Sequence, residues 1–214
     1  MCEKDLASTF YNKHTLRISR LNKLMNIHAY SISKVNGPGN RFVLWTQGCS
    51  KGCSECFNPL TWSFKRNILL TPEEIFELIK NYDIDGVTIT GGDPLEQEDI
   101  LSLLMLISTL DLRKGVILFT GYSIDEINKD FLLRKSLSYI DVLIDGRYEK
   151  DKKISSGLRG SENQNILYFS DKIKPDEIMI DQEIEVGLRD DKIYVTGFPN
   201  ISRKILRELG VIIK

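Results

Sequence analysis

The chain has 214 residues, 42% of them hydrophobic, which is enough for one packed domain with small additions. Its 29 Lys and Arg nearly balance its 30 Asp and Glu, unlike the strongly basic composition of a general nucleic-acid binder. No apolar run approaches the roughly 20 residues that span a bilayer, and residues 1–20 lack the apolar stretch of a secretory signal. We therefore expect a cytoplasmic protein that binds neither nucleic acid nor a membrane.

Strands and helices are predicted to alternate through the middle of the chain. The apolar run 42–46 is typical of a buried strand, and Thr71 and Glu74 can then form a helix capping box around Pro72. The pattern continues with strands over 87–90, 116–119, 141–144 and 166–169, and with helices over 96–110 and part of 124–136. Such alternation is typical of a parallel sheet with right-handed crossovers. The units are too few for a closed eight-stranded barrel, so we expect an α/β fold with a curved partial barrel or an open sheet.

Both ends of the chain differ from this alternating core, which we place at residues 27–170. Residues 1–26 form a mostly polar N-terminal extension. The tail, residues 171–214, is predicted to contain a β-hairpin with strands over 183–188 and 192–196. A short helix from Arg203 to Leu209 is expected to follow it.

The cysteines Cys49, Cys53 and Cys56 follow the first buried strand with the spacing C-x3-C-x2-C. Thiolates grouped in one loop suit zinc or an iron–sulfur cluster. Structural zinc normally takes four protein ligands, and only three candidates lie close together here. A [4Fe–4S] cluster held by three cysteines leaves one iron open for a cofactor. The ligand count favours such a cluster, with zinc and a distant fourth ligand, or unrelated buried cysteines, as the alternatives.

Other polar motifs also fall at predicted strand ends, where parallel sheets bind their ligands. Gly91-Gly92-Asp93 combines a turn that a ligand can approach closely with a carboxylate suited to an ammonium group. Asp145, after another strand, fits a turn cap and a cofactor ligand equally well. Arg159, in the polar loop 159–164, suits carboxylate recognition, although the loop alone is more typical of a solvated surface.

Taken together, these motifs resemble a known enzyme family. The cysteine spacing followed by Phe57 resembles the radical S-adenosylmethionine (SAM) signature, and residues 91–94 resemble that superfamily's glycine-glycine-acid-proline motif. The whole set is similar to the activating proteins of anaerobic (class III) ribonucleotide reductase. The matching stretches are 36–39, 48–62, 120–122, 141–146, 159–161 and 163–164.

The resemblance implies a radical SAM partial barrel and a set of cofactor contacts. Cys49, Cys53 and Cys56 would bind three irons of a [4Fe–4S] cluster, whose fourth iron would chelate the amino and carboxylate groups of SAM. The turn at Gly91, Gly92 and Asp93 would support the methionine ammonium, and the backbone at Phe57 would lie near the adenine. The remaining expected contacts are Thr120, Asp145, Arg159 and Ser161.

The resemblance also implies the reaction and its partners. One electron, from a donor such as flavodoxin or ferredoxin, would cleave SAM into methionine and a 5′-deoxyadenosyl radical. That radical would take a hydrogen atom from a glycine of a partner enzyme, the class III reductase, with no catalytic residue beyond the cluster and SAM.

Two other functions stay open at this point. One is a radical SAM enzyme that modifies a small molecule or a peptide, as 7-carboxy-7-deazaguanine synthase does, and the other is a non-catalytic zinc or electron-transfer module. The stretches 120–122 and 159–161 favour the activase over the first. Both ends of the chain exceed the usual compact activase, which leaves the partner's identity open.

Overall fold

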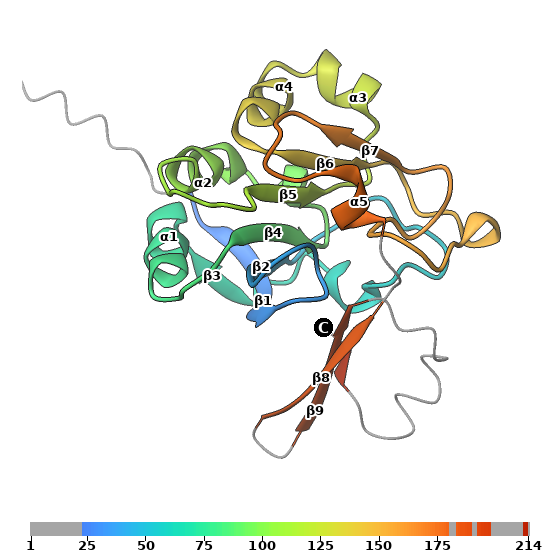
Figure 1. The fold of residues 1–214 in the computed structure, drawn as a ribbon, viewed down its shortest axis with the longest axis horizontal. Coiled ribbons are helices and arrows are strands. Elements are labelled where there is room, and N and C mark those ends of the chain that lie inside the picture. The colour runs from blue at the N-terminus through green and yellow to red at the C-terminus, as the bar shows by residue number, and fades with distance from the viewer. Residues whose placement is uncertain (1–22, 180–182, 190–191, 198–211, 214) are drawn as a thin grey trace, which may run out of the picture.

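A computed structural model describes residues 23–179, 183–189, 192–197 and 212–213. The main sheet of this described part contains seven strands. They are β1 (Met25–Ser33), β2 (Arg41–Thr46), β3 (Ile68–Leu70), β4 (Gly86–Gly91), β5 (Val116–Phe119), β6 (Val142–Asp145) and β7 (Asn165–Tyr168). Their order across the sheet is β3-β1-β2-β4-β5-β6-β7 (Figure 1).

The centre of the sheet is parallel and its margins are antiparallel. Strands β2, β4, β5 and β6 pair in parallel, as the alternation of strands and helices predicts. Strand β7 pairs antiparallel with β6, and β1 pairs antiparallel with both β2 and β3. A parallel neighbour is usually reached through a helix that crosses the face of the sheet. The β6–β7 connection, residues 146–164, holds a 3-10 turn at Lys150–Lys152 in place of such a helix, and β7 runs back beside β6.

The helices begin where the sequence carries capping residues. Helix α1 (Pro72–Lys80) has the predicted capping box, in which Thr71 accepts from the Glu74 amide and Glu74 accepts from the Thr71 amide. Helix α2 (Ile100–Ile107) is shorter than predicted because Pro94–Glu96 forms a separate 3-10 turn. The predicted helical stretch 124–136 divides at Asp130, whose side chain caps a new helix. The remaining helices are α3 (Ile124–Lys129), α4 (Phe131–Ser136) and the short α5 (Pro175–Ile178).

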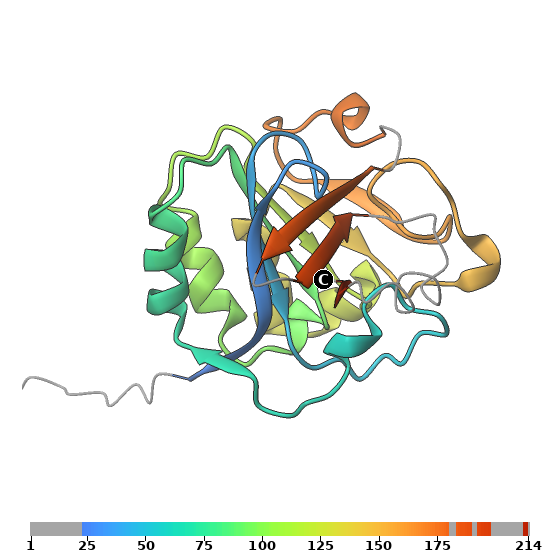
Figure 2. The same cartoon turned by 90° about the horizontal axis from the view of Figure 1, so that it is seen from below.

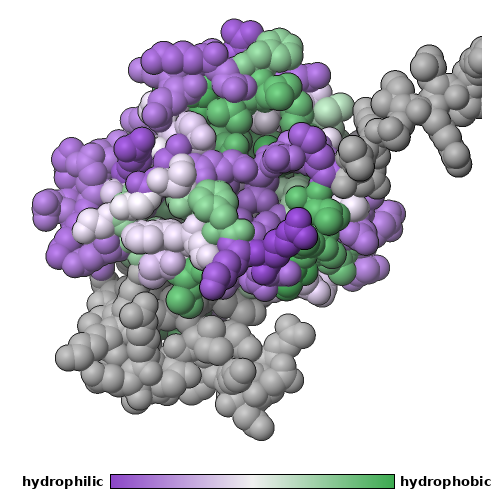
Figure 3. Space-filling model, turned by 180° about the vertical axis from the view of Figure 1, so that it is seen from behind, coloured by the Kyte–Doolittle hydropathy of each residue, from purple (hydrophilic) through white to green (hydrophobic). Residues whose placement is uncertain are grey.

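Two apolar clusters lie on opposite faces of the sheet, because successive strand residues point to opposite sides. Along β5, Val116 and Leu118 join the larger cluster, while Ile117 joins the smaller one. The larger cluster includes buried residues of α1 and α2, and Figure 1 shows these helices against one side of the sheet. Figure 3 shows the molecule from behind the view of Figure 1, where hydrophilic residues surround several hydrophobic areas.

At the amino end of the parallel strands, the guanidinium of Arg41 is fully buried. Its Nη2 donates to the carbonyls of Val87 and Gly115 at 2.6 and 3.0 Å, and its Nη1 donates to that of Lys114 at 2.8 Å. Further bonds run from Nη1 to the Pro38 carbonyl and from Nε to the Thr88 hydroxyl. The five N–H groups of the guanidinium thus have five acceptors in the core.

The C-terminal hairpin is present as predicted. Strands β8 (Ile184–Arg189) and β9 (Lys192–Gly197) pair antiparallel, and β10 (Ile212–Ile213) pairs in parallel with β9. The helix predicted over 203–209 lies outside the described residues, as do residues 1–22. In Figure 2, which is seen from below, the hairpin, in red, lies in front of the main sheet. No helix in the described ranges is long and apolar enough to cross a bilayer.

Candidate functional site

One pocket opens at the carboxyl ends of the parallel strands. Its empty volume is about 960 Å³ when the solvent-filled mouth is included. Cys49, Cys53 and Cys56 contribute to it together with Phe57 and Thr120. The other residues that line it are Asn36, Trp45, Lys51, Asn58, Thr90, Gly91, Gly92, Phe119, Gly121, Gly146, Tyr148, Leu158, Gly160, Gln164, Thr196 and Gly197. The pocket therefore brings together motifs that are far apart in the sequence.

The cysteine loop is held at its base by backbone hydrogen bonds. The amide of Gly48 donates to the Thr61 carbonyl at 2.7 Å, and that of Cys49 donates to the Trp62 carbonyl at 3.1 Å. A tight turn then brings the amide of Cys56 within 3.1 Å of the Cys53 carbonyl. These bonds return the segment that carries the cysteines to the end of β2 and fix its position beside the sheet.

Burial disfavours the thiolate form of Cys49 and Cys53 in the absence of a cation. It raises the pKa of Cys49 to about 11, and it raises the pKa of Cys53 as well. None of the three forms a disulfide. A bound metal centre would supply the positive charge that stabilises the thiolates, because metal binding and thiol deprotonation are coupled. Their protonation state therefore depends on what the pocket holds.

The described residues contain no group of three or more His, Cys, Asp or Glu side chains placed to hold one metal ion. A single zinc ion needs its ligands to converge on one point. An iron–sulfur cluster instead takes each thiolate on a separate iron. Cys49, Cys53 and Cys56 line one pocket, and each thiolate there would bind a separate iron of such a cluster.

Gly91 and Gly92 allow the end of β4 to pack against the end of β2. Gly91 has a φ of +104°, and a Cβ there would lie 2.5 Å from the Thr46 amide nitrogen. A Cβ at Gly92 would collide with the Gly48 carbonyl. The amide of Asp93 donates to that carbonyl at 2.9 Å. The glycines thus bring two strand ends into contact while their backbone remains in the wall of the pocket.

The Asp93 carboxylate is fully buried, and it accepts hydrogen bonds from residues at the end of the neighbouring strand, β5. It accepts from the Thr120 hydroxyl at 2.8 Å, from the Gly121 amide at 2.9 Å and from the Leu95 amide at 3.1 Å. Burial raises the pKa of Asp93 to about 6, although these hydrogen bonds act in the opposite direction. Asp93 therefore fixes the position of Thr120, which lines the pocket.

Lys51, between two of the cysteines, also lines the pocket. Its ammonium lies 3.5 Å from Oε1 of Glu96 and 3.2 Å from the centre of the Tyr122 ring. The Glu96 carboxylate also accepts from the amide and the hydroxyl of Ser50, at 2.9 and 2.5 Å. These contacts tie the cysteine loop to the segments that leave β4 and β5.

The loop 159–164 packs against the opposite part of the pocket. Phe57 and Tyr148 meet edge to face with ring centres 4.9 Å apart, and a Cβ at Gly160 would lie 2.5 Å from the Phe57 ring. Oε1 of Gln164 accepts from the amides of Gly160 and Ser161 at 2.8 and 3.2 Å. The loop is therefore a packed element of the site and not a solvated surface.

The polar side chains of this region are engaged inside the protein. Asp145 is fully buried and accepts from the Ile124 amide at 2.6 Å and from Nδ2 of Asn165 at 2.8 Å. Arg159 donates to the carbonyls of Glu162 and Gln164 at 3.0 and 2.9 Å, and the Ser161 hydroxyl accepts from the Glu149 amide at 3.1 Å. They stabilise the strand ends and loops around the pocket.

The predicted site residues thus fall into two groups. Cys49, Cys53, Cys56, Phe57, Gly91, Gly92 and Thr120 line the pocket, whereas Asp93, Asp145, Arg159 and Ser161 are not among its lining residues. Sequence reasoning missed Lys51, Tyr148 and Thr196. The position of Lys51 between two candidate ligands could have indicated it, whereas nothing in the sequence pattern connects Thr196 with the cysteines.

Comparison with known proteins identifies the family. A family model described as a 4Fe-4S single cluster domain matches residues 35–167. An anaerobic ribonucleoside-triphosphate reductase-activating protein of Enterobacteria phage T4 is 37% identical over 151 residues, which cover 67% of this chain and 94% of the relative. The chain belongs to the family of anaerobic ribonucleoside-triphosphate reductase-activating proteins. The proteins of the same description from Pasteurella multocida and Escherichia coli K12 are 37% and 32% identical, over 97% and 99% of their lengths.

A solved structure of QueE from Escherichia coli is a more distant match, with a TM-score of 0.39 and 20% identity over 46% of this chain and 53% of that one.

Membership of the family decides among the functions that the sequence left open. The protein is a radical SAM activating enzyme, and its cofactors are a [4Fe–4S] cluster and SAM. This result favours the activase over a small-molecule enzyme and over a zinc module.

Proposed function

We propose that this protein generates a glycyl radical on an anaerobic ribonucleoside-triphosphate reductase, with its cluster on Cys49, Cys53 and Cys56 and with SAM in the adjoining pocket. The observation that carries the proposal is the single pocket that the three cysteines share with Gly91, Gly92 and other strand-end residues. Relatives that this chain covers almost completely are named as activators of that reductase.

The residues of the pocket fit both cofactors. Three thiols in one wall suit a cluster with one open iron, and binding of the cluster would displace the protons that burial favours on Cys49 and Cys53. The adjoining backbone of Gly91 and Gly92 and the hydroxyl of Thr120 supply polar contacts for the amino-acid part of SAM. The ring of Phe57 supplies apolar surface for its adenosyl part.

When bound, the cluster and SAM supply reductive cleavage of a carbon–sulfur bond and abstraction of a hydrogen atom. The chain's own residues keep the pocket in shape. Asp93 fixes Thr120, Lys51 and Glu96 fix the cysteine loop, and Gln164 fixes the loop beside Phe57. We assign binding and positioning roles to these residues and no proton transfer to any of them.

Several finer assignments belong to the same proposal. The four parallel strands, with helices on one face and the pocket at their carboxyl ends, support a partial barrel of the radical SAM type. The proposed core is the one predicted at residues 27–170, extended to Met25, which pairs with Leu70 in the main sheet, and to Ile178, which is buried in the smaller apolar cluster. The electron donor is a low-potential protein such as flavodoxin or ferredoxin, and the reaction takes place in the cytoplasm.

The test is anaerobic reconstitution of the full chain with iron and sulfide, followed by reduction and electron paramagnetic resonance with and without SAM. We expect a cluster signal that changes on addition of SAM, with release of 5′-deoxyadenosine. Addition of an anaerobic ribonucleoside-triphosphate reductase should then produce a glycyl-radical signal on the reductase.

Cleavage of SAM without formation of a glycyl radical on the reductase would show that the protein acts on a different substrate. A cluster indifferent to SAM would contradict the cofactor assignment itself.

A further inference from the structure

The C-terminal hairpin lies outside residues 35–167, which match the family model. Its strands β8 and β9 form a small sheet with β10, separate from the main sheet. In Figure 1 the hairpin projects below the core, and in Figure 2, seen from below, it lies in front of the core. The hairpin is attached to the core by hydrogen bonds and by close packing.

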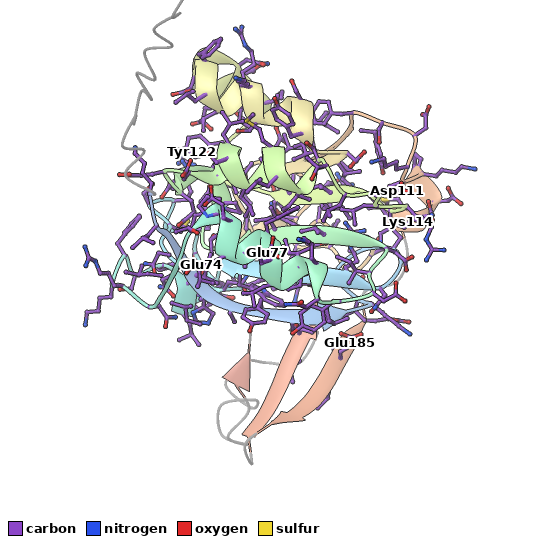
Figure 4. The ribbon with its side chains drawn as sticks, turned by 90° about the vertical axis from the view of Figure 1, so that its left-hand side faces the viewer. Glu74, Glu77, Asp111, Lys114, Tyr122 and Glu185 are labelled. Atoms are coloured by element: carbon purple, nitrogen blue, oxygen red, sulfur yellow. The ribbon has the colours of Figure 1, made fainter. Side chains whose placement is uncertain are left out.

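Both strands of the hairpin contact the connection between β1 and β2. In β9, the Thr196 hydroxyl oxygen accepts from Nδ2 of Asn36 at 2.9 Å. In β8, Oε1 of Glu185 accepts from the Lys34 amide at 2.8 Å, and Figure 4 shows Glu185 where the hairpin meets the core. Gly197 lies so close to Val35 that a Cβ there would be 3.0 Å from the valine Cγ2. Polar and apolar contacts from both strands thus attach the hairpin to the core.

The core side of this attachment is rigid. Asn36 is 8% exposed, and its Nδ2 also donates to the Ser33 hydroxyl at 2.8 Å. Its carbonyl accepts from the hydroxyl of Thr88, in the centre of β4, at 2.8 Å. Because the sheet itself fixes Asn36, a hairpin bonded to Asn36 has a defined position relative to the strand ends.

The hairpin also reaches the cofactor pocket. Thr196 and Gly197 line the pocket that contains the three cysteines, as does Asn36. We propose that the β8–β9 hairpin is an additional wall of the SAM pocket, and that Thr196 is the residue that positions this wall against the core. This inference rests on the assignment of SAM to this pocket, and it is independent of which partner receives the radical.

The proposal has a direct physical consequence. A wall attached through a part-buried hydrogen bond restricts the opening of the pocket and adds contact surface for the bound adenosyl compound. Loss of the bond should let the hairpin separate from Asn36 and should weaken ligand binding. One ordinary hydrogen bond corresponds to roughly a fivefold change in an equilibrium constant.

The test measures binding of S-adenosylhomocysteine, which cannot undergo the cleavage, to the anaerobically reconstituted full chain by calorimetry. Thr196→Val keeps the shape of the side chain and removes the hydroxyl, whereas Thr196→Ser keeps the hydroxyl. We expect the dissociation constant to rise about fivefold for the valine variant and to return near the wild-type value for the serine variant.

Hydrogen exchange on the same samples reports the attachment directly. The Lys34 amide should exchange about fivefold faster in Thr196→Val, because its acceptor, Glu185, belongs to the hairpin. Thr109→Val is the matched control, since the Thr109 hydroxyl donates to the Leu106 carbonyl at the exposed end of α2. We expect neither ligand affinity nor Lys34 exchange to change in that control.

Unchanged ligand affinity in Thr196→Val would overturn the proposal, including the case in which exchange becomes faster, because the hairpin would then be attached without forming a wall of the site. A reconstituted wild-type protein that holds its cluster and binds no S-adenosylhomocysteine would instead refute the cofactor assignment. The two failures are therefore distinguishable.

Discussion

The two ends of the parallel strands differ in whether their buried polar side chains are hydrogen-bonded within the protein or line a pocket. At the amino end, the guanidinium of Arg41 donates to carbonyl and hydroxyl acceptors of the core, so its hydrogen-bonding capacity is used within the fold. At the carboxyl end, Asp93 and Asp145 are likewise engaged internally, whereas the thiols of the cysteine loop line the pocket, and burial raises the pKa of Cys49 and Cys53. Buried polar residues therefore mark a site only when some of them remain available to a ligand.

The largest expected effect concerns the carboxyl end. Cys53→Ala removes a proposed cluster ligand, and we expect iron content to fall and SAM cleavage to drop by more than roughly 100-fold. Iron and sulfide analysis with a 5′-deoxyadenosine assay would measure both. Cys2→Ser is the matched control, because Cys2 lies outside the C-x3-C-x2-C motif, and it should be nearly silent. Full iron content and normal cleavage in the alanine variant would contradict the ligand assignment.

The next effect belongs to the amino end. Arg41→Met leaves several buried carbonyls without their donor, so the free energy of unfolding should fall by about 4 kcal/mol in denaturant titrations. Arg113→Met should cost less than about 1 kcal/mol, because the Arg113 side chain is 79% exposed. Folded Arg41→Met should still bind iron normally. Loss of iron would show that the two ends are coupled.

A third prediction uses the pH dependence of stability. The pKa of Asp93 rises from 3.8 to about 6 on folding, so folding favours its protonated form, and the associated stabilisation is lost as pH increases from about 4 to about 6. Relative to the wild type, Asp93→Asn should therefore gain up to roughly 3 kcal/mol across this range in the cluster-free protein. Denaturant titrations at several pH values would measure the difference. A constant difference would show that Asp93 titrates normally.

The smallest effect tests how the cysteine loop is held. Lys51→Met removes an ion pair whose side chains are 8% and 10% exposed, while Glu96 keeps its bonds to Ser50. We expect the free energy of unfolding to fall by about 2 kcal/mol, as measured in denaturant. Lys80→Met, which removes an exposed pair with Glu77 on α1, should change it by less than about 0.5 kcal/mol. Equal losses in the two variants would refute a specific role for Lys51.

Local physical chemistry in the sequence determined most of the elements. Thr71 and Glu74 form their predicted capping box because its two hydrogen bonds join residues three apart. The apolar runs that became β2, β4, β5 and β6 were recognisable because each is short, apolar and bounded by turn signals. The spacing of the cysteines likewise indicated a metal centre, since ligand type and number restrict the possible metals.

Tertiary structure decided what depends on contacts between distant residues. Strand β7 runs antiparallel although residues 146–164 are long enough for a crossover. Tyr148 and Gly160 in this connection pack on Phe57 beside the pocket, and no pattern within the strand itself shows this.

Asp93 does not line the pocket, and Thr120 and Gly121, on the next strand end, supply its donors. Thr196 reaches the pocket through a bond to Asn36, 160 residues earlier in the chain. The sequence by itself thus determined the family chemistry and the regular elements, which follow from neighbouring residues. Only the folded chain decided which polar groups satisfy one another and which remain for a ligand, because that depends on burial and on donors brought together by packing.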